Sequence, residues 1–159
     1  MNSMPRILLV EDDPADARLA LAVFEQLNLT DQVLSVTDGA EAWDFLQARG
    51  RYGTRTPGNP ALVVLDLKLP RVDGLELLSR AKGRNDLRLI PIVILSSSRE
   101  SSDLQRAYEL GANGYVVKTI DYDEYDSVLK SMVQYWANVN EAPPGSLPTS
   151  RTTLAPSRP

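Results

Sequence analysis

The chain has 159 residues, of which 43% are hydrophobic, and this is enough for one domain with a sizeable core. Its net charge of −4 argues against nucleic-acid binding, because contacts to phosphates need a basic surface. The sequence has no cysteine and no histidine, which excludes disulfides, thiolate or imidazole catalysis, and zinc sites built on those ligands. Carboxylates, hydroxyls, lysine and carbonyl oxygens remain, and they suit a hard cation such as Mg²⁺.

The first apolar run of the chain is too short for a signal peptide, because acidic residues follow it at once. No later segment is long and apolar enough to cross a bilayer. We therefore expect a cytoplasmic protein that does not contact membranes.

Five short apolar runs alternate with five helical patterns along the chain. The runs predict strands buried on both faces, at residues 6–10, 33–37, 61–65, 92–95 and 114–117. The helical patterns cover residues 14–27, 39–49, 74–85, 101–110 and 122–137. This alternation predicts an α/β fold: a flavodoxin-like, doubly wound, five-stranded parallel sheet in the order 2-1-3-4-5 with helices on both faces.

Two segments fall outside the alternating units. Residues 50–60 are polar and rich in glycine and proline, so we expect an exposed loop before the third strand. Residues 138–159 contain five prolines and few large apolar side chains, which predicts a disordered tail. The folded domain is therefore expected over residues 4–137.

Polar side chains follow four of the predicted strands. In chain order they are Glu11, Asp12 and Asp13 after the first strand, Asp66 and Lys68 after the third, Ser96, Ser97 and Ser98 after the fourth, and Lys118 and Thr119 after the fifth. Ligands of open parallel sheets bind beyond the carboxyl ends of the strands, where the strand order reverses. The first and third strands are neighbours at that point, so Asp12, Asp13 and Asp66 are expected to converge.

This acidic cluster predicts a site for a divalent cation. Like charges so close raise each other's pKa unless a cation lies between them, and Mg²⁺ prefers carboxylate and phosphate oxygens. Lys118 and Ser96 supply a positive charge and a hydrogen-bond donor for a phosphoryl group, so the combination indicates phosphoryl transfer. Taken singly these residues have plainer roles, since an aspartate such as Asp13 is often a helix N-cap.

Four motifs occur in the order found in one protein family. They are LLVEDD at residues 8–13, VVLDLKLPRVDG at 63–74, PIVILSSS at 91–98 and GANGYVVK at 111–118. With these motifs the sequence resembles the receiver domain of bacterial two-component response regulators, which are signalling proteins rather than enzymes.

The resemblance implies a role for each site residue. Asp66 is expected to accept a phosphoryl group from a phosphohistidine of a sensor histidine kinase or phosphotransfer protein. Asp13, Asp66 and the backbone carbonyl of Lys68 are expected to bind Mg²⁺, with Asp12 acting through a coordinated water. Lys118 is expected to pair with the phosphoryl oxygens.

The resemblance also implies a conformational switch. On phosphorylation the Ser96 hydroxyl closes onto the phosphoryl group, and Tyr115 rotates from solvent into the space released, which changes the surface of the fourth helix, fifth strand and fifth helix. The sequence departs from the family at Thr119, because a proline joined by a cis peptide usually follows the lysine. The geometry between Lys118 and Thr119 is therefore left open.

Further features resemble small stand-alone receivers that partner phytochrome-type sensor kinases. They are the insertion at residues 50–60, the missing proline after Lys118 and the pair Tyr135–Trp136. No output domain is expected after residue 137. The apolar stripe of the last helix is wide, and it belongs either to the core alone or also to a homodimer face formed by the fourth helix, fifth strand and fifth helix.

Two competing functions remain beside the receiver. A phosphatase of the haloacid dehalogenase type also forms an aspartyl phosphate with Mg²⁺, but it needs a second acid where Lys68 stands. A receiver-like adaptor that acts without phosphorylation usually lacks one of the acids or the lysine, and none is lost here.

Overall fold

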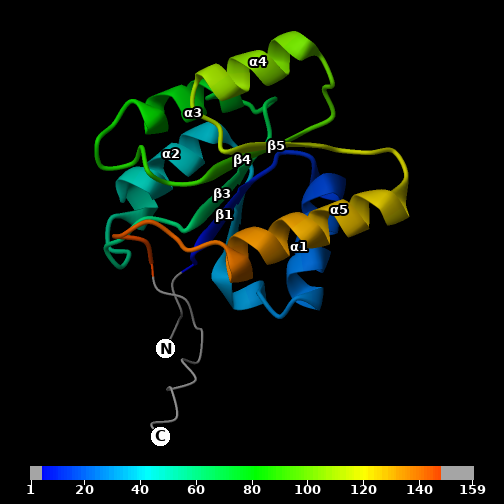
Figure 1. Ribbon diagram of the computed structural model, residues 1–159. Helices are drawn as coiled ribbons and strands as arrows, with labels where there is room; N and C mark the ends of the chain where they lie inside the picture. The colour runs from blue at the N-terminus through cyan, green and yellow to red at the C-terminus, as the bar shows by residue number, and fades with distance from the viewer. Residues whose placement is uncertain (1–4, 148–159) are drawn as a thin grey trace, which may run out of the picture.

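The protein is a three-layer α/β domain with a central parallel sheet (Figure 1). The computed structural model describes residues 5–147. The five strands are parallel in the order β2-β1-β3-β4-β5, which confirms the predicted flavodoxin-like fold. Within the described residues no helix has the length and apolar character needed to cross a membrane.

The elements lie close to their predicted positions. The strands are β1 (Ile7–Val10), β2 (Val33–Val36), β3 (Leu62–Leu65), β4 (Ile92–Ser96) and β5 (Gly114–Val117). The α-helices are α1 (Pro14–Gln26), α2 (Gly39–Gln47), α3 (Gly74–Lys82), α4 (Ser101–Glu109) and α5 (Tyr122–Gln134). Two 3₁₀ turns, η1 (Thr30–Gln32) and η2 (Gly50–Tyr52), precede β2 and β3, and a π-helical turn, η3 (Tyr135–Val139), extends α5.

The sheet separates two hydrophobic cores. Side chains alternate along each strand, so Leu8 and Val10 pack under α2, α3 and α4, while Ile7 and Leu9 pack under α1 and α5. Figure 1 shows α1 and α5 side by side on one face of the sheet and the other three helices on the opposite face. Both layers leave the carboxyl ends of the strands free to form a site.

Aspartate side chains begin three of the helices beside those strand ends. Asp13, Asp38 and Asp121 accept hydrogen bonds from backbone N–H groups in the first turns of α1, α2 and α5. Pro14 occupies the first position of α1, where a missing N–H costs nothing. These caps fix where the chain turns from each strand-end loop into a helix.

Residues 50–60 form the predicted surface connection, and they are tied firmly to α2. The Arg55 guanidinium donates hydrogen bonds to the carbonyl oxygens of Phe45 and Gly58, at 2.8 and 2.7 Å. The Tyr52 ring packs edge-on against Phe45. The insertion is thus an ordered part of the domain.

The segment after α5 differs from the prediction of a disordered tail. Residues 140–147, here called the C-terminal strap, run back to the loop before β3 (Figure 1). The rest of the predicted tail, residues 148–159, lies outside the described residues.

Backbone hydrogen bonds hold the strap in place. The Asn59 N–H donates to the Gly145 carbonyl at 3.0 Å, and the Leu147 N–H donates to the Asn59 carbonyl at 2.7 Å. Leu147 is only 3% exposed, and its side chain lies beside Gly58, where an added Cβ would be 2.9 Å from Leu147 Cδ2. A single buried leucine and this short ladder therefore order a proline-rich segment that lacks helical or strand periodicity.

Candidate functional site

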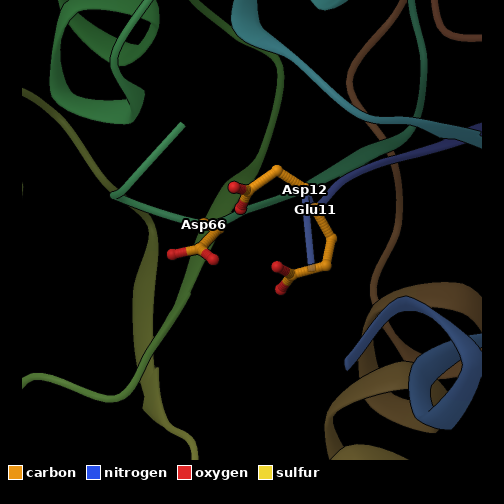
Figure 2. Close-up of side chains that lie close together, drawn as sticks. All are labelled: Glu11, Asp12 and Asp66. Atoms are coloured by element: carbon orange, nitrogen blue, oxygen red, sulfur yellow. The ribbon is translucent and has the colours of Figure 1, made fainter. Parts of the chain in front are cut away.

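Three carboxylates meet at the carboxyl ends of β1 and β3 (Figure 2). Glu11, Asp12 and Asp66 each place one oxygen within 4.8 Å of the others. Glu11 and Asp66 are buried, being 2% and 9% exposed, whereas Asp12 is exposed. An oxygen-only set of this kind fits a hard divalent cation such as Mg²⁺.

The register of the sheet brings the acids together. Val10 and Leu65 are partners on β1 and β3, so the residues that follow them, Glu11 and Asp66, leave neighbouring strands at the same level. The Asp66 N–H donates to the Val10 carbonyl at 3.0 Å, and the Glu11 N–H donates to the Val36 carbonyl at 3.1 Å. The acidic side chains therefore start from a fixed backbone.

Lys118 reaches the acidic cluster from the end of β5. Its Nζ donates to Glu11 at 2.6 Å, to Asp16 at 2.9 Å and to Asp66 at 3.1 Å. A lysine ammonium has three N–H donors, so all three are engaged. Because the lysine side chain is only 11% exposed, solvent screens these charge-assisted bonds weakly.

Burial and charge act in opposite directions on Glu11 and Lys118. Burial raises the pKa of Glu11 to about 7, and the hydrogen bond from Lys118 lowers it only in part. Burial lowers the pKa of Lys118, but its hydrogen bonds to Glu11 and Asp16 outweigh this and hold the pKa above its ordinary value. Lys118 is therefore a permanent cation, while Glu11 ionises near neutral pH.

Asp13, predicted as a metal ligand, is not part of the carboxylate cluster. Its side chain accepts hydrogen bonds from the N–H groups of Ala15 and Asp16, at 2.8 and 3.0 Å, and so caps α1. The bond from the Asp16 N–H is the main cause that lowers the pKa of Asp13. The chain enters α1 directly after Asp13, so this acid serves the helix and Glu11 lies in the cluster in its place.

Ser96 and Tyr115 are joined through the loop after β4. Ser96 is buried, and its Oγ accepts a hydrogen bond from the Ser98 N–H at 3.2 Å. Tyr115 is half-buried, and its hydroxyl donates to the Ser98 carbonyl at 3.0 Å. The Ser98 hydroxyl donates to Asp103 of α4. Tyr115 is therefore turned toward this loop, although the sequence predicts that it starts from solvent.

Two further predicted positions flank Asp66 and Lys118. The Lys68 N–H donates to Asp66 Oδ1 at 3.2 Å, which places Lys68 beside the carboxylate, while the role of its carbonyl stays a prediction. The described residues contain no cis peptide, so the bond between Lys118 and Thr119 is trans. The Thr119 hydroxyl donates to the Asp121 carbonyl at 3.2 Å and so steadies the approach to α5.

Two acids of the site, Glu11 and Asp16, carry no predicted role. The signal for Glu11 is its place directly after the apolar run ILLV, where a buried carboxylate is costly unless it has a partner. The contact of Asp16 joins residues 102 positions apart, and no local pattern predicts it.

Comparison with known proteins agrees with this geometry. Residues 7–130 match the family described as the response regulator receiver domain. The chain belongs to this family. Receiver domains are signalling proteins rather than enzymes, and sensor histidine kinases phosphorylate them.

Several of the similar proteins are response regulators of phytochromes or bacteriophytochromes. Response regulator Rcp1 of Synechocystis is 35% identical over 130 residues, covering 82% of this chain and 87% of Rcp1. Rcp1 has also been solved in a Mn²⁺-bound form, at a TM-score of 0.81 and 33% identity over 89% of this chain and 99% of that one. The phosphorylated cyanobacterial phytochrome response regulator RcpA has a TM-score of 0.81 at 32% identity, covering 90% of this chain and 99% of RcpA. The bacteriophytochrome response regulator AtBRR is 48% identical with a TM-score of 0.67, covering 85% of this chain and 96% of AtBRR.

Proposed function

We propose that Asp66 accepts a phosphoryl group from a sensor histidine kinase or a phosphotransfer protein. In this step a carboxylate oxygen of Asp66 forms a bond to phosphorus, while the bond from phosphorus to the donor's histidine nitrogen breaks and its electron pair returns to the ring. The observation that carries the proposal is the buried Asp66 carboxylate with Lys118 Nζ at 3.1 Å. Lys118 is placed to neutralise the charge that the phosphoryl oxygens add.

The carboxylates of Glu11, Asp12 and Asp66 are the proposed ligands of Mg²⁺, together with the carbonyl of Lys68. Their oxygens lie close enough for one cation, and the Mn²⁺-bound form of the similar protein Rcp1 supports binding of a divalent ion. When bound, such an ion neutralises charge on the carboxylates and on the incoming phosphoryl oxygens. The chain itself supplies the fixed register that keeps three acids together.

Ser96 and Tyr115 are the proposed switch residues. The Ser96 hydroxyl keeps its own proton free for donation, since its oxygen is the acceptor in the bond from the Ser98 N–H. Tyr115 contacts the same loop through the Ser98 carbonyl. A shift of Ser96 toward a phosphoryl group on Asp66 therefore moves the loop that Tyr115 and α4 share, which changes the face of α4, β5 and α5.

The similarity to phytochrome response regulators supports a phytochrome-type kinase as the donor. A cytoplasmic location fits this role, because such a kinase draws its phosphate from cytoplasmic ATP. A homodimer through α4, β5 and α5 is also part of the proposal. The side chains of Tyr108 on α4 and Tyr122 on α5 are 52% and 58% exposed and would be covered by a second copy.

Intact mass measured after incubation with acetyl phosphate and Mg²⁺ tests the acceptor. We expect one phosphate adduct on the wild type and none on Asp66→Asn. The matched control is Asp13→Asn, which should keep the adduct because Asp13 caps α1 outside the carboxylate cluster. No adduct on the wild type would favour an adaptor, and rapid continuous release of phosphate would favour a phosphatase.

A further inference from the structure

A buried hydroxyl without a partner lies in the first turn of α5. Tyr125 is 3% exposed, and its hydroxyl makes no hydrogen bond to the described residues. Leaving such a group unpaired destabilises a folded state, and a group of this kind calls for an explanation. Tyr125 belongs to the core between the sheet, α1 and α5.

The surroundings of this hydroxyl are the charged side of the site. Burial raises the pKa of Tyr125 above its ordinary value, and the charges of Lys118 and then Asp16, Glu11 and Asp66 also act on it. The hydroxyl therefore keeps its proton and is a donor at neutral pH. The hydroxyl is thus an unused donor within electrostatic reach of the three carboxylates that share the Lys118 ammonium.

A phosphoryl group on Asp66 would compete with the carboxylates for the N–H donors of Lys118. All three donors of Lys118 are engaged in the resting structure, so a phosphoryl oxygen can gain one only if a carboxylate gives one up. Among the three partners Asp16 is the most accessible, with a side chain 34% exposed against 2% for Glu11 and 11% for Asp66. Asp16 is therefore the partner that can turn away at the lowest cost.

We propose that, when Asp66 is phosphorylated, the Asp16 carboxylate gives up its bond from Lys118 and accepts a hydrogen bond from the Tyr125 hydroxyl instead. Tyr125 is then a positioning residue: it receives the released carboxylate, leaves Lys118 free to pair with the phosphoryl group, and links the start of α1 to the start of α5. This exchange rests on the proposed function, because it needs a phosphoryl group on Asp66.

Binding of beryllofluoride, a phosphoryl analogue, in the presence of Mg²⁺ tests the exchange by calorimetry on the full chain. Tyr125→Phe removes only the hydroxyl, and it should weaken beryllofluoride binding about tenfold, the size expected for a hydrogen bond to a charged group. Tyr135→Phe, an exposed tyrosine in the turn that extends the same helix, is the matched control and should bind as the wild type does. In an Asp16→Ala background the Tyr125→Phe change should have no further effect.

The resting protein gives a second readout. Without ligands, Tyr125→Phe should leave the unfolding midpoint unchanged or raise it, because the hydroxyl has no partner to lose. A lower midpoint, unchanged beryllofluoride affinity, or an equal loss of affinity in the Asp16→Ala background would each overturn the exchange while leaving Asp66 as acceptor. If the wild type itself binds no beryllofluoride, the proposed function fails together with the exchange.

Discussion

Burial affects the pKa of the Glu11 carboxyl more than its ion pair with Lys118 does. In the metal-free protein its pKa is about 7 against an ordinary 4.5, because burial outweighs the hydrogen bond from Lys118. The unfolded chain releases this proton near pH 4.5 and the folded chain only near pH 7, so the folded state binds more protons in this interval. The contribution of Glu11 to stability is therefore present below pH 4.5 and is lost as the pH rises toward 7.

Urea unfolding in the presence of EDTA at pH 5 and pH 7.5 measures this effect. The wild type should lose roughly 2 kcal/mol more stability over this interval than Glu11→Gln, which has no proton to release. An equal change in unfolding free energy between the two pH values in both proteins would show that burial does not raise the pKa of Glu11.

Gly74, the first residue of α3, lies against the backbone of Asp66 and Leu67. A Cβ at this position would lie 2.1 Å from the Asp66 carbonyl oxygen and 2.7 Å from the Leu67 Cα, so α3 can start here only without a side chain. We expect Gly74→Ala to cost about 2 kcal/mol or more in unfolding free energy and to reduce the phosphate adduct on Asp66, because the backbone must move.

A matched substitution separates this close approach from the general effect of adding a methyl group. Gly114→Ala on β5 would place its Cβ 3.6 Å from the nearest atom, an ordinary contact. Its adduct should equal that of the wild type, and similar losses in both variants would contradict the argument.

The residues of the site were predictable to different degrees. Asp66 and Lys118 directly follow β3 and β5, and Ser96 ends β4, so the strand pattern alone places them at one edge of the sheet. The choice between Glu11 and Asp13 depends on where β1 passes into α1, and an aspartate before Pro14 has a local partner in the helix N–H groups. Asp16 meets Lys118, and Tyr125 is buried where α5 packs on α1, only through long-range contacts that periodicity does not show.

At the scale of elements, all five strands and all five α-helices could be predicted. The reason is that short apolar runs and amphipathic helical patterns alternate along the chain. The C-terminal strap could not. Its order depends on a bridge between Asn59 and Ser146 and on positive φ angles at Gly58 and Gly145, of 132° and 87°. These are long-range and conformational features, and composition alone favours disorder.

Leu147 should anchor the strap by itself. Leu147→Ala removes most of a side chain that is 3% exposed and packs on Gly58, so we expect a loss of about 2 kcal/mol in unfolding free energy. Val139→Ala is the control, because Val139 is 65% exposed and its truncation should be nearly neutral. Urea denaturation of both variants checks this. A neutral Leu147→Ala would mean that the strap does not contribute to the fold.

At the scale of the whole molecule, the face of α4, β5 and α5 is proposed to pair two copies. Sedimentation velocity should show a dimer for the wild type and a shift toward monomer for Tyr122→Ala, which removes an exposed aromatic from this face. Trp136 is a poorer probe, since it packs partly against the core under α5. A wild type that is monomeric both before and after phosphorylation would contradict the dimer.

Reduction of the phosphorylated protein with borohydride tests the central claim most directly, because the reagent converts an aspartyl phosphate into homoserine that peptide mapping can locate. After treatment with acetyl phosphate and Mg²⁺ we predict homoserine at position 66 alone, and none when the phosphate donor or Mg²⁺ is omitted. Homoserine at Asp12 or another acid, or none at position 66, would contradict the assignment of Asp66 as the phosphoryl acceptor.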